Sequence, residues 1–174
     1  MKKGFTMIEL IFVIVILGIL ASVAIPRLAG TRTDAEISAT VANIRTLISD
    51  AASYYAVKGS FAGAKWRDIT NVPIRLGDSR KPVKDQHPAN ENVYLAAGGK
   101  NCILVRLRDK GGAGRPVAFI QIAKVDANVN EPICKEILAA APIKAFLDSR
   151  VEDPNLEYGN DKGAIAIGSS TTIY

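Results

Sequence analysis

One carboxylate, Glu9, directly precedes an apolar run from Leu10 to Ile25 that contains no charged residue. Placing an ionised side chain in hydrocarbon costs at least ~2.5 kcal/mol even on the most lenient insertion scales. Such residues are usually retained for a specific partner, so the chemistry that Glu9 can do is to form an ion pair. The sequence therefore raises the question of which cation pairs with Glu9.

Side chains that could catalyse a reaction are sparse in the rest of the chain. The single histidine, His87, lies next to a proline in a polar stretch typical of a solvated turn. The glycine-rich residues 111–114 lack the lysine, threonine or acidic partner that phosphate-binding loops need. No nucleophile–base motif surrounds a serine or a cysteine. We therefore expect no enzymatic activity and no catalytic residue.

The apolar segment from Phe5 to Ile25 is long enough to cross a membrane once. It has 21 residues, and a helix of that length reaches ~30 Å, the thickness of a hydrocarbon core. Ser22 and Ala24 offer a small-x-small site for a signal peptidase, and a plain membrane anchor is a second alternative. The sequence after Pro26 continues directly into a helix pattern, which favours a retained helix over a cleaved signal peptide.

The N-terminus resembles that of a known family. Lys2 and Lys3 precede the segment Gly4–Leu10, whose sequence is GFTMIEL, and Pro26 lies near the far end of the apolar run. This combination is similar to the N-terminus of type IV pilins and type II secretion pseudopilins. The motif covers about 25 of the 174 residues.

The resemblance implies that a prepilin peptidase cleaves between Gly4 and Phe5 and methylates the new N-terminal residue, Phe5. Residues 1–4 would then be a leader. Glycine fits the position before the cut because it has no Cβ to hinder the approach of a peptidase. The resemblance also implies that Glu9 pairs with the N-terminal amine of an adjacent subunit, which would make Glu9 an assembly latch.

Pro26 has two interpretations. Proline lacks a backbone N–H and clashes with the preceding turn, so it could end the membrane helix. Members of the family instead carry the helix through this point with a kink or a locally melted stretch. Because the pattern beyond Pro26 is helical, we expect a helix kink there rather than a helix end.

The implied function is that of a structural subunit of a type II secretion pseudopilus or a related type IV pilus-like filament, which polymerises through its N-terminal helix to drive protein secretion. The implied partners are copies of the chain or other pilins in a mixed filament, prepilin peptidase, the inner-membrane assembly platform, and inner-membrane lipid before assembly. Lys2 and Lys3 fit the positive-inside rule, so we expect a single pass of the bacterial inner membrane with the C-terminal domain in the periplasm. Two alternatives are a minor type IV pilin that binds DNA or a surface, and a simple membrane-tethered periplasmic domain.

A second helix pattern follows the apolar run. From Thr33 to Tyr55 apolar residues recur at spacings of three and four, which indicates one buried helix face. Gly59 supplies a stop signal. We therefore predict one long helix from Phe5 to Val57, with a membrane-spanning or filament-core part at residues 5–26 and an amphipathic part at residues 27–59. The apolar positions of the amphipathic part are Ile37, Val41, Ile44, Leu47, Ile48, Ala51, Tyr54 and Tyr55.

Residues 60–174 are enough for one small globular domain. Glycine clusters bound several apolar runs that read as strands, and a helix is predicted from Glu131 to Leu147, interrupted or broken by Pro142. The fold class is therefore α+β, pilin-like, with the long helix packed on a small antiparallel sheet. The strands are expected at Val93–Leu95, Cys102–Leu107, Val117–Val125 and Ala164–Ile167, with Lys110–Pro116 as the loop of a hairpin.

The two cysteines, Cys102 and Cys134, lie in the domain that this topology places in the periplasm. In an oxidising compartment an even count favours a disulfide. Such a bond would contribute roughly 3 to 4 kcal/mol in the chain-entropy model and would pin the helix at Glu131 to the first hairpin strand. Two unpaired buried thiols are the alternative.

An acidic stretch near the C-terminus gathers oxygen ligands, of which calcium takes six to eight. Major pseudopilins hold calcium in a C-terminal loop, so the resemblance offers Asp153, Asn155, Glu157 and Asp161 as calcium ligands. A solvated acidic loop is the alternative, and no other cofactor is expected.

The charge balance argues weakly for a nucleic-acid partner. The formal net charge of +5 falls to +3 when Lys2 and Lys3 leave with the leader, because 20 Lys and Arg then face 17 Asp and Glu. Basic residues do cluster in one part of the domain, and basic patches attract phosphate backbones. We nevertheless favour a solvated surface over DNA binding. The cluster consists of Lys65, Arg67, Arg75, Arg80, Lys81 and Lys84.

Overall fold

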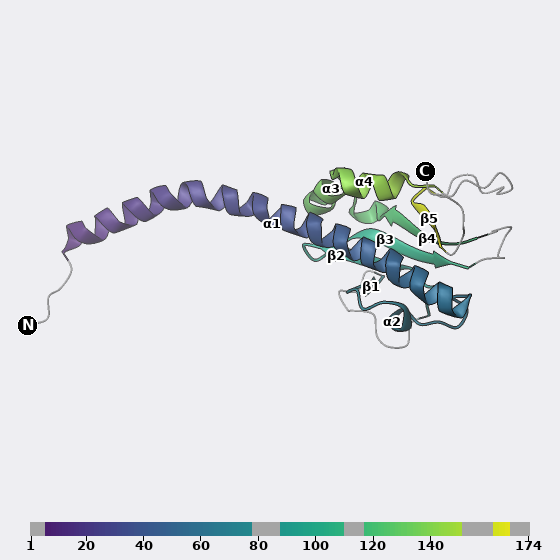
Figure 1. Cartoon of the computed structure of the whole chain (residues 1–174). Coiled ribbons are helices and arrows are strands. Elements are labelled where there is room, and N and C mark those ends of the chain that lie inside the picture. Colours follow the sequence, from purple (N-terminus) through teal and green to yellow (C-terminus); the bar gives the residue numbers. More distant parts are fainter. Residues whose placement is uncertain (1–5, 78–87, 110–116, 151–161, 168–174) are drawn as a thin grey trace, which may run out of the picture. The chain divides into compact units, whose positions relative to one another are not determined.

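The computed structural model describes residues 6–77, 88–109, 117–150 and 162–167. Its contacts divide the chain into two units, Met1–Ala35 and Glu36–Tyr174, which we describe separately. Figure 1 labels the helices and strands.

The long helix α1 runs from Met7 to Lys58 and has 52 residues. It continues through position 26, so the prediction that the helix does not end at Pro26 is confirmed. The side chain of Pro26 lies outside the described part, and the kink stays a prediction. The helix ends where the sequence predicted. The backbone of Gly59 has a φ of 71°, which favours glycine. Its N–H donates to the carbonyl oxygen of Tyr55 at 2.7 Å.

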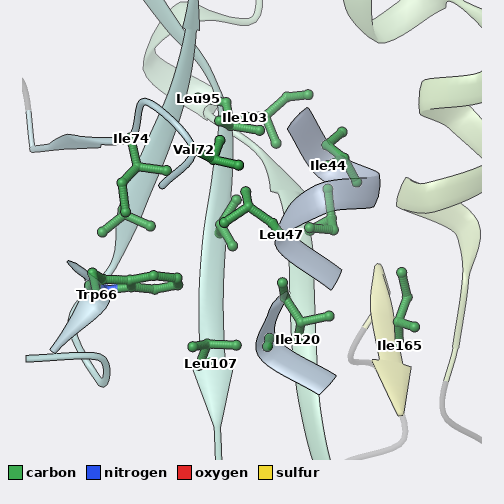
Figure 2. Packing of buried hydrophobic residues seen from close by; sticks show 14 of the residues in the cluster. Ile44, Leu47, Trp66, Val72, Ile74, Leu95, Ile103, Leu107, Ile120 and Ile165 are labelled. Carbon is green, nitrogen blue, oxygen red and sulfur yellow. The ribbon is translucent and has the colours of Figure 1, made fainter. Parts of the chain in front are cut away.

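In the second unit, the apolar face of α1 packs on the sheet. Four apolar residues of this face are buried: Val41, Ile44, Leu47 and Ala51. Because they recur at spacings of three and four, successive turns of the helix each contribute a side chain to the core. Figure 2 shows Ile44 and Leu47 pointing toward the strands. The remaining predicted positions are half-buried against the same core: Ile37, Ile48, Tyr54 and Tyr55.

The sheet has five strands in the order β1-β2-β3-β4-β5, and every neighbouring pair is antiparallel. Strands β2 and β3 meet at Gly98 and Gly99, which have φ values of 54° and 82°. Two consecutive residues with positive φ make the hairpin turn that matches the twist of the strands. The strands are β1 (Arg75–Leu76), β2 (Val93–Ala97), β3 (Lys100–Arg108), β4 (Ala118–Lys124) and β5 (Ala164–Ile167). All four predicted strands are thereby confirmed, to within two residues at each end.

Two short helices continue the core beyond α1. They are α3 (Pro132–Ala139) and α4 (Ala141–Asp148). The break between them is at Ala140, whose ψ of 131° is extended, and Pro142 lies in the first turn of α4, where its missing N–H costs nothing. The predicted interruption by Pro142 is thus confirmed. Ile137 and Ile143 are fully buried and join the cluster that contains α1 and the sheet.

The segment between α1 and β1 contains α2 (Trp66–Ile69). A short 3-10 helix follows β4 at Asp126–Asn128. Trp66 is 1% exposed, and its indole nitrogen donates to the carbonyl oxygen of Glu91 at 3.0 Å. Near the other end of the sheet, Gly163 has a φ of 79°, and a Cβ there would lie 1.7 Å from the carbonyl oxygen of Ile122. Only glycine therefore fits at the entry to β5.

Candidate functional site

Thr6 and Glu9 form a closed hydrogen-bonded pair at the start of α1. The Oε2 atom of Glu9 accepts from the backbone nitrogen of Thr6 and from its hydroxyl, each at 2.8 Å. The backbone nitrogen of Glu9 donates to the Thr6 hydroxyl oxygen at 3.3 Å. Because α1 begins at Met7, Thr6 is the N-cap residue and Glu9 is the third residue of the helix, which is the arrangement of a capping box.

This geometry fixes which oxygen of Glu9 is engaged. Both hydrogen bonds from Thr6 end on Oε2, and within the described residues no hydrogen bond reaches Oε1. The carboxylate also lies at the helix N-terminus, where the unsatisfied N–H groups and the helix dipole favour a negative charge. The site therefore holds an anion in a defined place, and its second oxygen accepts no hydrogen bond from the described residues.

The helix surface around Glu9 is apolar and exposed. The segment Met7–Ala24 has a mean hydropathy of 2.8, is not buried against any part of the described chain, and is long and apolar enough to cross a membrane. Met7 is 80% exposed and Ile8 75%. Burial of apolar surface stabilises by roughly 25 cal/mol per Å², so a surface of this kind requires lipid or another protein as its environment.

Comparisons with known proteins bear directly on this site. Residues 1–25 match the model of the prokaryotic N-terminal methylation motif. A fimbrial protein of Neisseria meningitidis serogroup B (strain MC58) is 30% identical over 128 residues, which cover 67% of this chain and 75% of that protein. The chain belongs to the type IV pilin family. No solved structure matches it significantly.

Membership in the type IV pilin family bears on three of the predicted site residues: Gly4, Phe5 and Glu9. The family is one of structural proteins that polymerise into filaments after processing by a prepilin peptidase. Gly4 and Phe5 lie within the matched motif but outside the described residues, so cleavage and methylation at this bond stay predictions. Glu9 is described, and its role in assembly also stays a prediction.

The predicted disulfide is present between Cys102 and Cys134, whose Cα atoms are 5.0 Å apart. Both cysteines are buried, at 2% and 0% exposure. Cys102 lies where the pairing of β2 with β3 shifts register, and Cys134 lies in the first turns of α3. The ammonium of Lys100 adds a 2.7 Å ion pair to Glu131 beside this bond. The disulfide therefore pins α3 to β3, as the sequence predicted.

The remaining predictions fall mostly outside the described residues. The proposed calcium ligands Asp153, Asn155, Glu157 and Asp161 all do so, and the described residues contain no group of three or more side chains that could hold a metal ion. Three members of the basic cluster, Arg80, Lys81 and Lys84, also lie outside. Of the others, Arg75 donates to the carbonyl oxygen of Gly99 at 3.2 Å, which is a structural contact.

Two side chains with defined roles in the structure were not singled out from the sequence. One is Thr6, and the Thr-x-x-Glu spacing at a helix start could have identified it as a capping box. The other is Asp109, whose Oδ2 accepts from the Ser60 hydroxyl at 2.5 Å and from the Phe61 backbone nitrogen at 2.9 Å. No local pattern predicts a contact between positions so far apart in the sequence.

Proposed function

We propose that the mature chain is a structural subunit of a type IV pilus-like filament and polymerises through the N-terminal part of α1. The observation that supports this most strongly is the exposed apolar segment Met7–Ala24, in which Glu9 is the one charged residue. A helix with this surface is stable in lipid before assembly and among the corresponding helices of other subunits after it. The compact domain at its C-terminal end then lies outside the hydrocarbon.

The assembly step that we propose is the formation of an ion pair. Hydrolysis of the peptide bond between Gly4 and Phe5 creates an amine on Phe5, which remains cationic when it is methylated. In a medium of low dielectric a matched pair of charges is far less costly than an unpaired charge, so docking of this amine on the Glu9 of a neighbour selects one register between the subunits. Docking at any other register leaves two charges unmatched.

Thr6 supports the same step because its hydrogen bonds fix the position of the Glu9 carboxylate. Before assembly, the two donors of Thr6 satisfy Oε2 and so reduce the cost of keeping a carboxylate in a bilayer. The incoming amine is proposed to use Oε1, which has no hydrogen bond within the described residues. In this scheme the capping box does not have to open when the neighbouring subunit arrives.

The choice between a pilus and a secretion pseudopilus rests on a different observation. The N-terminal motif is shared by both kinds of filament, so it does not distinguish a pilus from a secretion pseudopilus. The relative with 30% identity is named a fimbrial protein, which supports the pilus. We propose the pilus on this ground, with prepilin peptidase and an inner-membrane assembly platform as partners and the domain in the periplasm before assembly.

The experiment that tests the function is mass spectrometry of the membrane-extracted protein together with electron microscopy of sheared cell-surface material. We expect a mature chain that starts at methylated Phe5, and filaments that contain this chain. A Gly4 substitution should abolish both, whereas a substitution of Ser53, whose hydroxyl bonds within α1, should change neither. An intact Met1 or a cut after Ala24 in the wild-type protein would overturn the proposal.

A further inference from the structure

Arg106, in the middle of the sheet, carries a charge that the described chain does not match. Its Nε atom is buried and has no hydrogen-bond partner. Within the described residues, its guanidinium forms no hydrogen bond and no ion pair. Buried polar groups are nearly always hydrogen-bonded, so such an exception calls for a partner. Of the three nitrogen atoms only Nε is covered, which leaves the two Nη groups open to that partner.

The side chain of Arg106 points away from the core that α1 covers. Successive side chains of a strand point to opposite faces, and both neighbours of Arg106 in β3, Val105 and Leu107, belong to the core cluster. Arg106 therefore lies on the other face of the sheet. We call this the outer face, and it carries Leu104, Arg106, Arg108 and Phe119. Leu104 and Phe119 are buried, but neither belongs to the core cluster.

The outer face is basic. By the register of the strands, Arg75 and Arg108 lie on the same face as Arg106. The five described strands contain no acidic residue that could balance these charges. Arg75 and Arg108 each donate to a backbone carbonyl oxygen, at 3.2 and 3.5 Å. Among the described arginines of this face, Arg106 is thus the one whose donors are unused.

The helices on the opposite face supply an unmatched carboxylate. Ile137 of α3 and Ile143 of α4 belong to the core cluster, so these helices cover the same face of the sheet as α1. Glu136 of α3 is exposed, and in the part of the chain that the structure describes it forms no hydrogen bond or ion pair. No cation lies one turn away along the helix, where the neighbours are Pro132, Ile133, Ala139 and Ala140.

Glu136 fits the role of a partner better than the second exposed acid of these two helices. That acid, Asp148, has Lys144 one turn before it in α4, and residues four apart on a helix are neighbours on its surface. The charge of Asp148 is therefore partly balanced within its own helix. Glu136 has no such neighbour and is surrounded by small or apolar side chains, which leave room for an incoming guanidinium.

The chemistry of Arg106 favours a carboxylate of a second copy over a free polyanion. A guanidinium is a planar fork that matches a carboxylate with two parallel hydrogen bonds. A polyanion such as DNA gains its affinity from several phosphate contacts together, whereas this face offers one cation with unused donors. An ion pair at a half-exposed site is weak, so its partner must be held nearby by other contacts. A neighbouring subunit whose N-terminal helix is already docked meets this condition.

We propose that the Nη groups of Arg106 bind the Glu136 carboxylate of an adjacent subunit in the filament. This inference rests on the proposed filament function, and it adds a contact between globular domains to the contact between N-terminal helices. The two groups lie on opposite faces of the sheet, so they do not pair within one chain. A contact between two unlike faces is heterologous, and it repeats from copy to copy into an open filament where the rotation does not close a ring.

Exchange of the two charges tests the pair. Arg106→Glu and Glu136→Arg each place like charges opposite one another and should lower the yield of filaments, relative to membrane-bound subunit, about fivefold, which corresponds to about 1 kcal/mol. The double variant restores opposite charges and should restore the yield. The matched control combines Glu136→Arg with Lys144→Glu. It has the same net charge as the exchange but leaves Arg106 opposite an arginine, so it should stay as defective as Glu136→Arg alone.

Zero-length cross-linking locates the contact without relying on yield. Arg106→Lys keeps the cation and supplies a primary amine, which carbodiimide condenses with a touching carboxylate, with loss of the elements of water. Filaments are assembled from equal amounts of ¹⁴N- and ¹⁵N-labelled full-length chain. We expect a peptide that joins position 106 to Glu136 in mixed-isotope form, which only a link between subunits can produce. Arg45→Lys puts the same amine at an exposed site on α1 and should give no link to Glu136.

The outcomes distinguish the two proposals. If filaments form but the exchange variant stays as defective as the single variants, or position 106 gives no mixed-isotope link to Glu136, the pairing is wrong and the filament function stands. Salt-dependent retention of the wild-type chain on DNA that Arg106→Gln abolishes would assign the outer face to a polyanion and also overturns the pairing. Absence of filaments from the wild-type chain overturns the proposed function and the pairing with it.

Discussion

The carboxylate of Asp109 lies 2.9 Å from the backbone nitrogen of Phe61, although 48 residues separate the two in sequence. This contact fastens the loop after α1 to the end of β3. Hydrogen bonds to charged groups contribute about 1.5 to 3 kcal/mol, so Asp109→Ala should lower the free energy of unfolding of the domain by about 2 kcal/mol. Asp109→Asn, which keeps an acceptor, should lose less. Urea titration of the full chain in detergent measures both, and equal stability of Asp109→Ala and wild type would contradict the prediction.

Thr6 should affect assembly through its hydroxyl. Thr6→Ala removes the cap and one of the donors to Glu9, and the loss of an N-cap side chain typically costs about 1 kcal/mol. We expect about a fivefold lower yield of filaments relative to membrane-bound subunit, the ratio to which that energy corresponds. Thr6→Ser keeps the hydroxyl and should restore the yield. Immunoblots of sheared and membrane fractions give the ratio, and a serine variant as defective as the alanine variant would argue against the capping box.

Glu9→Gln tests the charge of Glu9 with little change of shape. The amide still accepts from Thr6 but cannot form an ion pair with an amine. We expect normal processing to Phe5, normal retention in the membrane, and loss of filaments by at least about tenfold. The N-terminal peptide and the filament yield are measured in the same cells. Wild-type filament yield from this variant would show that the ion pair is dispensable.

The disulfide should stabilise the domain without taking part in assembly. Replacement of both Cys102 and Cys134 by serine should lower the free energy of unfolding by roughly 3 to 4 kcal/mol, the chain-entropy estimate for a loop of this length. The bond is buried, so reductant should act on the native protein only slowly. Denaturation curves with and without reductant provide the measurement, and reductant that leaves the unfolding midpoint unchanged would contradict it.

Tyr55 should make the domain lose stability in alkali. Its pKa is raised in the folded state above the ordinary value of 10.0, by burial and by Asp109. A raised pKa contributes stability that is fully present below the unfolded pKa and is lost as the pH rises through the folded pKa. The unfolding midpoint of wild type should therefore fall more steeply above about pH 10 than that of Tyr55→Phe. If the unfolding midpoints of the two proteins fall equally with rising pH, Tyr55 does not destabilise the domain in alkali.

Most of the fold could be predicted because its signals are local. The spacing of Val41, Ile44, Leu47 and Ala51 depends only on the helix period, and it correctly gave the face of α1 that is buried. Apolar runs bounded by glycine clusters likewise located the strands. The two-residue strand β1 and the single-turn helix α2 were not delimited, since elements so short carry no period.

The candidate site, too, could be predicted only where its signal is local. Glu9 could be identified because a lone carboxylate in an apolar segment is costly wherever the chain folds. The contact of Asp109 with Ser60 and Phe61 could not, because it brings together the loop after α1 and the far end of β3, and only the register of the sheet determines that they meet. The disulfide could be predicted only in part. The even count of cysteines suggested a bond, but only the fold shows that Cys102 and Cys134 lie close enough to form it.

The strand order of the sheet repeats the order of the strands in the chain. Each strand after β1 therefore finds a pairing partner among residues that the ribosome has already made, and the sheet can grow in the direction of synthesis. Such a topology keeps the separation between paired strands small for β1 to β4, which favours rapid folding. The apolar N-terminal segment is synthesised before the domain, so a chain held by it at a membrane can complete its domain without waiting for a distant segment to return.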